Sequence, residues 1–110
     1  DARALSLVMD GIDRGWDRQL PLAGSVFFYM PLMHAENLAV QETCIRCFQA
    51  LLADAAPERR KALQGNVDFA LSHRDIIARF GRFPYRNAAL GRTSRSEEEE
   101  FLRSGPRFGQ

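Results

Sequence analysis

Residues 58–80, ERRKALQGNVDFALSHRDIIARF, carry the longest helical pattern in this 110-residue chain. Four of their side chains recur at i, i+4, i+7 and i+11, which places them on one face of an α-helix: Phe69, His73, Ile76 and Phe80. Pro57 precedes the pattern at a position that tolerates its missing N–H, and Gly81 is a natural helix stop. We expect this helix to be central, with an interruption near Gly65 left open.

The helical pattern repeats towards the N-terminus. Residues 2–15 place four apolar side chains on one face at i, i+3, i+4 and i+7: Leu5, Val8, Met9 and Ile12. Residues 36–53 form a further strong helix with a near-heptad apolar stripe. The short apolar run at residues 25–30 fits either a buried strand or a buried helical turn. Because helices flank this run and no partner strand is predicted, we interpret it as helix.

A last helix is predicted to begin near Ser94 or Ser96, since either serine can cap it. Glu97 or Glu99 would then stand at the third position of a capping box. The acidic run at residues 97–100 lies where the helix dipole favours carboxylates. We therefore interpret the run as a capping feature without functional weight.

These segments predict an all-α fold, an antiparallel array of about five helices with no sheet. A chain of this length forms at most one domain, so residues 1–110 are treated as a single helical domain. The net charge of +1 gives no global field that would favour a nucleic acid or a membrane surface. No apolar run approaches the roughly 20 residues needed to span a bilayer. Two cysteines and no secretory signal point to a reducing cytoplasm.

The segment after the central helix is rich in arginine. Fourteen of the fifteen basic residues are Arg, and five of these lie between His73 and Arg92. Gly81 and Pro84 bend the backbone there, so several guanidinium groups can converge on one point. Converging arginines bind a phosphate or a carboxylate bidentately. The predicted ligand-binding residues are Arg79, Arg82, Arg86, Asn87 and Arg92.

A structural interpretation of the same segment stays open. Arginines near a helix C-terminus satisfy orphan carbonyl groups, and others can pair with acids on neighbouring helices. Phe80 and Phe83 would then belong to the core rather than stack on a ligand. On this interpretation the loop holds helices together.

The two histidines are candidates for proton transfer. His34 lies two residues before Glu36, and His73 lies two residues before Asp75. This spacing is wrong for both members of a pair to point the same way on a helix, so no metal site is predicted. A histidine on an apolar face, as His73 is, more often hydrogen-bonds a backbone carbonyl in the core. His34, Glu36 and His73 remain the candidate catalytic residues, with no reaction assigned.

Other chemical signatures are weak or missing. Cys44 and Cys47 form a C-x-x-C pair, but they lie in the middle of a predicted helix without a redox or zinc context. We interpret them as small buried hydrophobic residues. No Gly-rich phosphate loop, G-x-S-x-G elbow or H-E-x-x-H motif occurs. No cofactor is therefore predicted, and no motif indicates specific nucleic-acid binding.

Two stretches of the chain belong to a longer recognisable pattern. The first is Pro31-Leu32-Met33-His34-Ala35-Glu36 with Gln41 following, and the second runs from His73 through Arg79-Phe80-Gly81-Arg82-Phe83-Pro84 to Phe101-Leu102. Together they resemble an uncharacterised bacterial family, the domain of unknown function numbered 924. The resemblance covers essentially the whole chain and implies an all-α, tetratricopeptide-like array with no established activity. It favours a shared polar site or buried network over incidental surface arginines.

Two departures from the family pattern affect these expectations. Tyr85 stands where the family usually has His, which removes one candidate base. The upstream half of the family pattern is absent, so the chain resembles the C-terminal part of a longer domain. Apolar helix faces are then expected to be exposed, and such patches tend to be covered by association. We therefore expect a homodimer.

Two functional hypotheses remain. The first is a binding module or enzyme that holds a small phosphate or carboxylate through the Arg/Asn/His cluster. If it is an enzyme, hydrolysis or transfer at a phosphate or carboxyl ester is expected, with His34 or His73 as the acid or base. The second is an interaction scaffold that binds a peptide on its concave face and uses the arginine loop as a clasp. Neither hypothesis involves a membrane.

Overall fold

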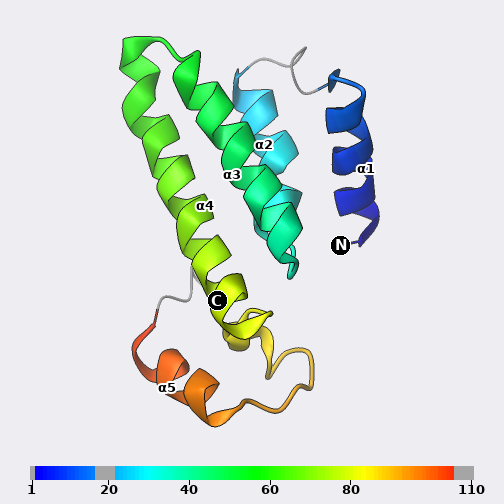
Figure 1. Cartoon of the computed structure of the whole chain (residues 1–110), viewed down its shortest axis with the longest axis vertical. Coiled ribbons are helices and arrows are strands. Elements are labelled where there is room, and N and C mark those ends of the chain that lie inside the picture. The colour runs from blue at the N-terminus through cyan, green and yellow to red at the C-terminus, as the bar shows by residue number, and fades with distance from the viewer. Residues whose placement is uncertain (1, 17–21, 106–110) are drawn as a thin grey trace.

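The computed structural model describes residues 2–16 and 22–105. The helices in these ranges are α1 (Ala2–Asp13), α2 (Leu22–Met33), α3 (Leu38–Ala53), α4 (Arg60–Phe80) and α5 (Ser96–Ser104), with 3-10 turns η2 (Pro57–Arg59) and η3 (Pro84–Arg86). No strand occurs in the described ranges, which confirms the predicted all-α array. From α1 to α4 successive helices run in alternating directions, whereas α5 lies beyond the C-terminal end of α4 (Figure 1).

The hydrophobic core has two parts that α4 connects. The larger part lies mainly between α2, α3 and α4, and its buried side chains include Leu32, Met33, Cys44, Ile45, Phe48, Val67 and Ala70. The smaller part joins the end of α4 to the following loop through Ile76, Ile77, Phe80 and Phe83, with Phe101 of α5 packed against it. Because α4 contributes to both parts, it is the central helix that the sequence pattern predicted.

Helix α4 runs through Gly65 without the interruption that the sequence left open. Three of the four residues predicted on its apolar face are buried, but Phe69 is 54% exposed. Gly81 ends the helix in the left-handed conformation with φ 74°, which glycine adopts without steric cost. The Gly81 N–H donates to the carbonyl of Ile77 at 2.8 Å. The chain therefore turns sharply out of α4 into the arginine-rich loop.

The connection between α2 and α3 is held by a side chain of α3 and by the residue that caps its N-terminus. The fully buried Gln41 donates from Nε2 to the carbonyls of Met33 and Ala35 at 2.7 and 2.8 Å. These carbonyls come at the end of α2, where a helix lacks its own donors. The side chain of Asn37 caps the N-terminus of α3. Residues 34–37 are thereby fixed between the two helices.

Helix α5 begins differently from the prediction. Its N-cap is Arg95 rather than either predicted serine, and Glu98 is the acid at the third helical position. The Glu98 side chain is fully buried. The interpretation of the acidic run as a capping feature is confirmed for Glu98, although its cap partner is Arg95 rather than a serine. Glu98 completes a capping box, but it also accepts hydrogen bonds from a distant arginine.

Candidate functional site

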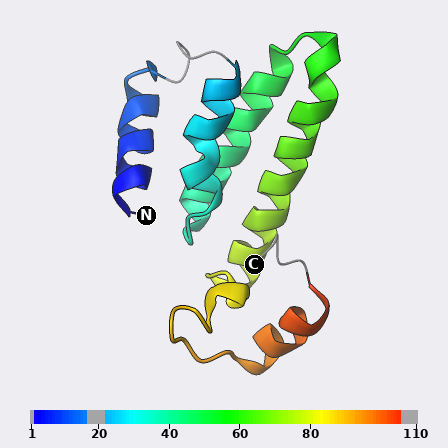
Figure 2. The ribbon, with the colours of Figure 1, turned by 180° about the vertical axis from the view of Figure 1, so that it is seen from behind.

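The predicted site residues gather where the α2–α3 connection meets the loop that follows α4. Seen from behind, this connection and the C-terminal end of α4 lie at the same end of the array (Figure 2). Two arginines of the loop form bidentate ion pairs with carboxylates that lie outside it. We call these pairs, Arg82–Glu98 and Arg92–Glu36, the arginine clasp.

The first half of the clasp attaches α5 to the loop. Arg82 donates from Nε to Glu98 Oε2 at 2.8 Å and from Nη2 to Glu98 Oε1 at 2.7 Å. Its Nη2 also donates to the Thr93 carbonyl at 2.8 Å. Arg95 adds its backbone N–H to Glu98 Oε1 at 2.8 Å. The hydrogen bonds from Arg82 are the main reason that the pKa of Glu98 lies well below its ordinary value.

The second half of the clasp attaches the loop to the α2–α3 connection. Arg92 donates from Nη1 and Nη2 to the two carboxylate oxygens of Glu36 at 2.9 and 3.0 Å. The Phe83 N–H donates to Glu36 Oε2 at 2.6 Å. Burial alone would raise the pKa of Glu36, but the hydrogen bonds from Arg92 and Phe83 lower it below its ordinary value. Glu36 is therefore ionised and held by three donors.

Asn87 also has its polar atoms engaged within the loop. It is buried, its Nδ2 donates to Ser94 Oγ at 3.1 Å, and its Oδ1 accepts from Arg92 Nε at 3.0 Å. The Asn87 side chain also hydrogen-bonds Glu98, so Arg82, Asn87 and Arg92 form one hydrogen-bonded unit with the two glutamates. The geometry is that of a structural clasp, because the guanidinium groups point at protein acceptors.

Arg86 is placed differently from the clasp arginines. Its Nη1 donates to the backbone carbonyl of His34 at 3.0 Å, and its guanidinium lies over the Phe83 ring at 4.6 Å. It forms no ion pair with an acid in residues 2–16 and 22–105. A half-buried arginine without a carboxylate partner retains donors for an external anion.

The two histidines lie side by side, with ring centroids 5.9 Å apart. His34 is exposed, whereas His73 is 1% exposed. His73 Nδ1 lies 2.7 Å from the Phe69 carbonyl, so Nδ1 carries the proton that this hydrogen bond requires. Burial, and then the charge of Arg86, lower the pKa of His34, and burial is also the main cause of the lowered pKa of His73. The expected core role of His73 agrees with this geometry.

A groove of about 670 Å³ opens beside His34 and Arg86. Its polar lining comes from the α2–α3 connection and the loop: His34, Glu36, Asn37 and Arg86. Its apolar lining comes chiefly from α1 and α2 and includes Leu5, Phe27, Met30 and Pro31. Arg79 does not line this groove. Its guanidinium lies over the Phe80 ring at 4.6 Å, on the exposed surface of α4.

A family model described as bacterial protein of unknown function (DUF924) matches residues 1–106. The chain belongs to this family. It is also similar to a solved structure, a protein of unknown function, ATU0120, from Agrobacterium tumefaciens, with 35% sequence identity and a TM-score of 0.75. That match covers 92% of this chain and 51% of the other, so the chain spans about half the length of this relative. No curated protein matches the chain.

Sequence reasoning about this DUF924 chain missed Glu98 of the clasp and Arg95, which hydrogen-bonds Glu98. Arg95 donates from Nη2 to the Phe80 carbonyl at 2.8 Å and so joins α5 to the end of α4. The contact between Arg95 and Glu98 could have been predicted from the sequence, because residues three apart are neighbours at a helix N-terminus. The pairing of Glu98 with Arg82 had no such signal, since it depends on the path of the loop.

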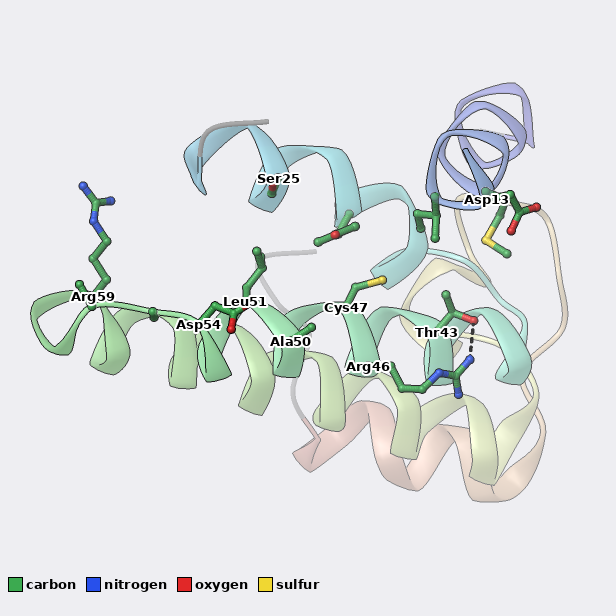
Figure 3. Close-up of a pocket in the computed structure, with 14 residues that line it drawn as sticks. Asp13, Ser25, Thr43, Arg46, Cys47, Ala50, Leu51, Asp54 and Arg59 are labelled. Atoms are coloured by element: carbon green, nitrogen blue, oxygen red, sulfur yellow. Dashed lines mark hydrogen bonds between the residues drawn. The ribbon is translucent and has the colours of Figure 1, made fainter. Parts of the chain in front are cut away.

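A second groove of the DUF924 chain lies between α1 and α3, with α2 at its base. Its volume is about 950 Å³. Figure 3 shows Arg59 and Asp54 at one end and Arg46, bonded to Thr43, towards the other. Ala50 of α3 also lines it.

Cys47 lies in this second groove, and its neighbour Cys44 is fully buried in the core. Burial raises the pKa of Cys44 to about 12, so its thiol is unreactive, in keeping with a core role. No group of three possible metal ligands occurs in the described part of the chain, and no helix there is long and apolar enough to cross a membrane.

Proposed function

We propose that this DUF924 chain binds a small anionic ligand, a phosphate or a carboxylate, through Arg86 and His34. The observation that carries the proposal is the position of Arg86 in the groove, where it has no carboxylate partner among the described residues. The proposal narrows the five predicted ligand-binding residues to the one arginine that lines the groove. Arg82, Asn87 and Arg92 do not contact the ligand in this proposal; they hold the loop that carries Arg86 in place.

The charges around the groove favour an anion. The carboxylate of Glu36 also lines the groove, but Arg92 offsets its charge through two hydrogen bonds. The charge of Arg86 is therefore left in excess. The N-terminus of α3, capped by Asn37, adds the positive end of a 16-residue helix dipole. An anion bound to Arg86 would interact favourably with both.

The clasp gives Arg86 a fixed position. Glu36 binds the loop on one side, and Glu98 binds it on the other. Arg86 lies between these anchors in the turn η3, and the Phe83 ring supports its guanidinium. Fixing a binding group before the ligand arrives reduces the entropy lost on binding. The structural interpretation of the loop and the anion-binding interpretation are therefore compatible, because the clasp holds Arg86 in position for the ligand.

Of the three candidate catalytic residues, His34 is the one we propose for proton transfer. Glu36 is occupied by Arg92 and Phe83, and His73 is buried behind the His34 ring. The lowered pKa of His34 keeps its imidazole neutral near pH 7, which is the form that accepts a proton. No substrate is assigned, so the role is restricted to accepting a proton from a bound ligand.

Isothermal titration with phosphate, sulfate, citrate and acetate tests the proposal. The wild type should bind at least one of these anions, and Arg86→Gln should weaken that binding tenfold or more. Arg79→Gln is the matched control, because Arg79 is an exposed arginine outside the groove. Equal binding by wild type and Arg86→Gln would refute the proposal. Arg82 is unsuitable for this test, since its replacement also breaks the clasp.

Peptide binding is a second candidate function, and the groove between α1 and α3 favours it (Figure 3). A tetratricopeptide-like scaffold would hold the peptide against α3, with Arg46 and Arg59 available to its acidic side chains. Displayed peptides selected on the wild type should lose binding to Ala50→Glu, which places a charge in the groove. They should keep binding to Ala78→Glu, an exposed alanine of α4. Peptides that bind Ala50→Glu as well as they bind the wild type would argue against this function.

A homodimer also remains a proposal for this chain. Leu7 in α1 is 59% exposed, and Trp16, three residues after the end of α1, is 45% exposed. Exposed apolar side chains of this size favour association when they form a continuous patch. Light scattering on the purified chain at micromolar concentration should then give twice the monomer mass. A monomer mass that Leu7→Ser leaves unchanged would contradict the dimer.

A further inference from the structure

The α2 face that lines the Arg86 groove changes from apolar to polar along the helix. Phe27, Met30, Pro31 and His34 follow the spacing i, i+3, i+4 and i+7, and all four line the groove. Seven residues of helix correspond to about 10 Å. The apolar side chains of this face therefore extend from about one turn (Pro31 and Met30) to about two turns (Phe27) from the anion-binding end. A ligand in contact with both ends must be elongated.

Among the described residues, Phe27 is the most exposed of the large apolar side chains, at 78%. The opposite wall of the groove is also apolar, since Leu5 and Ala4 of α1 face it. Contact with a ligand would remove some of this apolar surface from water, which is favourable in proportion to the area covered. An exposed aromatic wall beside an arginine that lacks a carboxylate partner suits a ligand with two chemically different parts.

The size of the groove leads to the same conclusion. Its volume of about 670 Å³ lies within the range of roughly 300–1,000 Å³ typical of pockets for organic ligands. An inorganic anion on Arg86 would fill only the polar end. The apolar walls would then contribute nothing to affinity or selectivity.

We infer that the ligand is a small organic acid with one anionic head and an apolar body, whose head binds Arg86 while its body lies along Met30 and Phe27. This inference rests on the proposed function, because it assumes that Arg86 binds the head. It adds the class of ligand: an acid with a hydrocarbon chain or an aryl group. Selectivity then comes from α2 and charge recognition from the loop.

Titration calorimetry with acetate, butyrate, hexanoate and octanoate, all free in solution, tests the inference. Affinity for the wild type should rise about two- to fourfold per methylene group, the gain expected for a partly to fully buried methylene. Phe27→Ala should flatten this dependence for the longer acids and leave acetate binding unchanged. Leu7→Ala is the control, because Leu7 is exposed but does not line the groove. It should preserve the dependence.

The outcomes separate this inference from the function on which it rests. Arg86-dependent binding with the same affinity for all four acids would overturn the inference and leave anion binding intact. The absence of any Arg86-dependent binding would overturn both. Binding to anionic phospholipid vesicles but not to the soluble acids would place this face on a membrane surface and overturn the inference. So would a dimer that dissociates in Phe27→Ala, because a second copy would then occupy the groove.

Discussion

Arg82 and Glu98 form a bidentate ion pair at 2.7 and 2.8 Å across sixteen residues of chain, and the carboxylate of this pair is fully buried. A buried carboxylate is tolerated only when donors satisfy it, and Glu98 has Arg82 together with the backbone and side chain of Arg95. The pair therefore fixes α5 against the loop.

Replacing Glu98 with Gln should destabilise the chain. The amide keeps the shape but loses the charge-assisted bonds to Arg82, which should cost about 1–3 kcal/mol of unfolding free energy. Urea denaturation measures this change. The neighbouring Glu99→Gln is the control, since Glu99 is exposed and should change the unfolding free energy by less than about 0.5 kcal/mol. Equal effects of the two variants would show that the buried pair adds nothing.

Replacing Arg92 with Lys should also destabilise, although the charge is kept. A lysine cannot donate two parallel bonds to Glu36 or reach Asn87 and the Phe83 carbonyl at the same time. We expect a loss of about 1–3 kcal/mol in unfolding free energy. The exposed Arg103→Lys is the matched control. A stable Arg92→Lys protein would mean that the clasp works through charge alone.

The free energy of unfolding should fall in two steps as the pH is lowered. His34 and His73 have folded-state pKa values below the ordinary 6.5, so the unfolded chain binds protons first as the pH falls below about 6.5. Glu36 and Glu98 have pKa values below the ordinary 4.5, so their contribution is present above that value and is lost at lower pH. Urea denaturation between pH 8 and about 2 measures both steps.

The first of these steps has a direct check in His73→Gln. This variant removes one of the two groups that titrate below pH 6.5, so it should lose less stability than the wild type between pH 7.5 and 5.5. The comparison concerns the slope, since the variant is expected to be less stable at every pH. A slope identical to that of the wild type would contradict the assignment of this step to His73.

Alanine substitutions at two glycines, one inside α4 and one at its C-terminal end, should change the stability of the chain in opposite directions. Gly65 lies inside the helix with open space around it, so Gly65→Ala should stabilise by up to about 1 kcal/mol. Gly81 has φ 74°, and Gly81→Ala should destabilise by about 1 kcal/mol, although the space is equally open. Thermal denaturation of the two variants measures the difference. Destabilisation by Gly65→Ala would argue that α4 bends there.

The periodic part of the fold was predictable because it depends on local spacing. Apolar residues three and four apart identified α1, α3 and α4, and the stop at Gly81 followed from its backbone freedom. Phe69 was predicted on the buried face but is exposed, because the pattern does not say how far a neighbouring helix extends. The short run that became part of α2 was resolved correctly only through its helical neighbours.

The sequence predicted which residues gather at the site, but not which arginine pairs with which acid. The sequence placed Arg82, Arg86 and Arg92 in one loop, and it gave no means of knowing which would meet an acid. Glu36 pairs with Arg92 across 56 residues, a relation that no local rule contains. The choice of Arg86 as the arginine facing the groove therefore depends on the folded structure.

The most direct test of the anion site is an NMR titration that follows the arginine side-chain Nε–H signals while hexanoate is added. The Arg86 signal should shift saturably, and those of Arg79, Arg82 and Arg92 should move far less, because Arg86 alone of these four lines the groove without a carboxylate partner. A saturable shift of Arg82 or Arg92 with an unchanged Arg86 signal would contradict this account, because it would show that the clasp itself opens to bind the ligand.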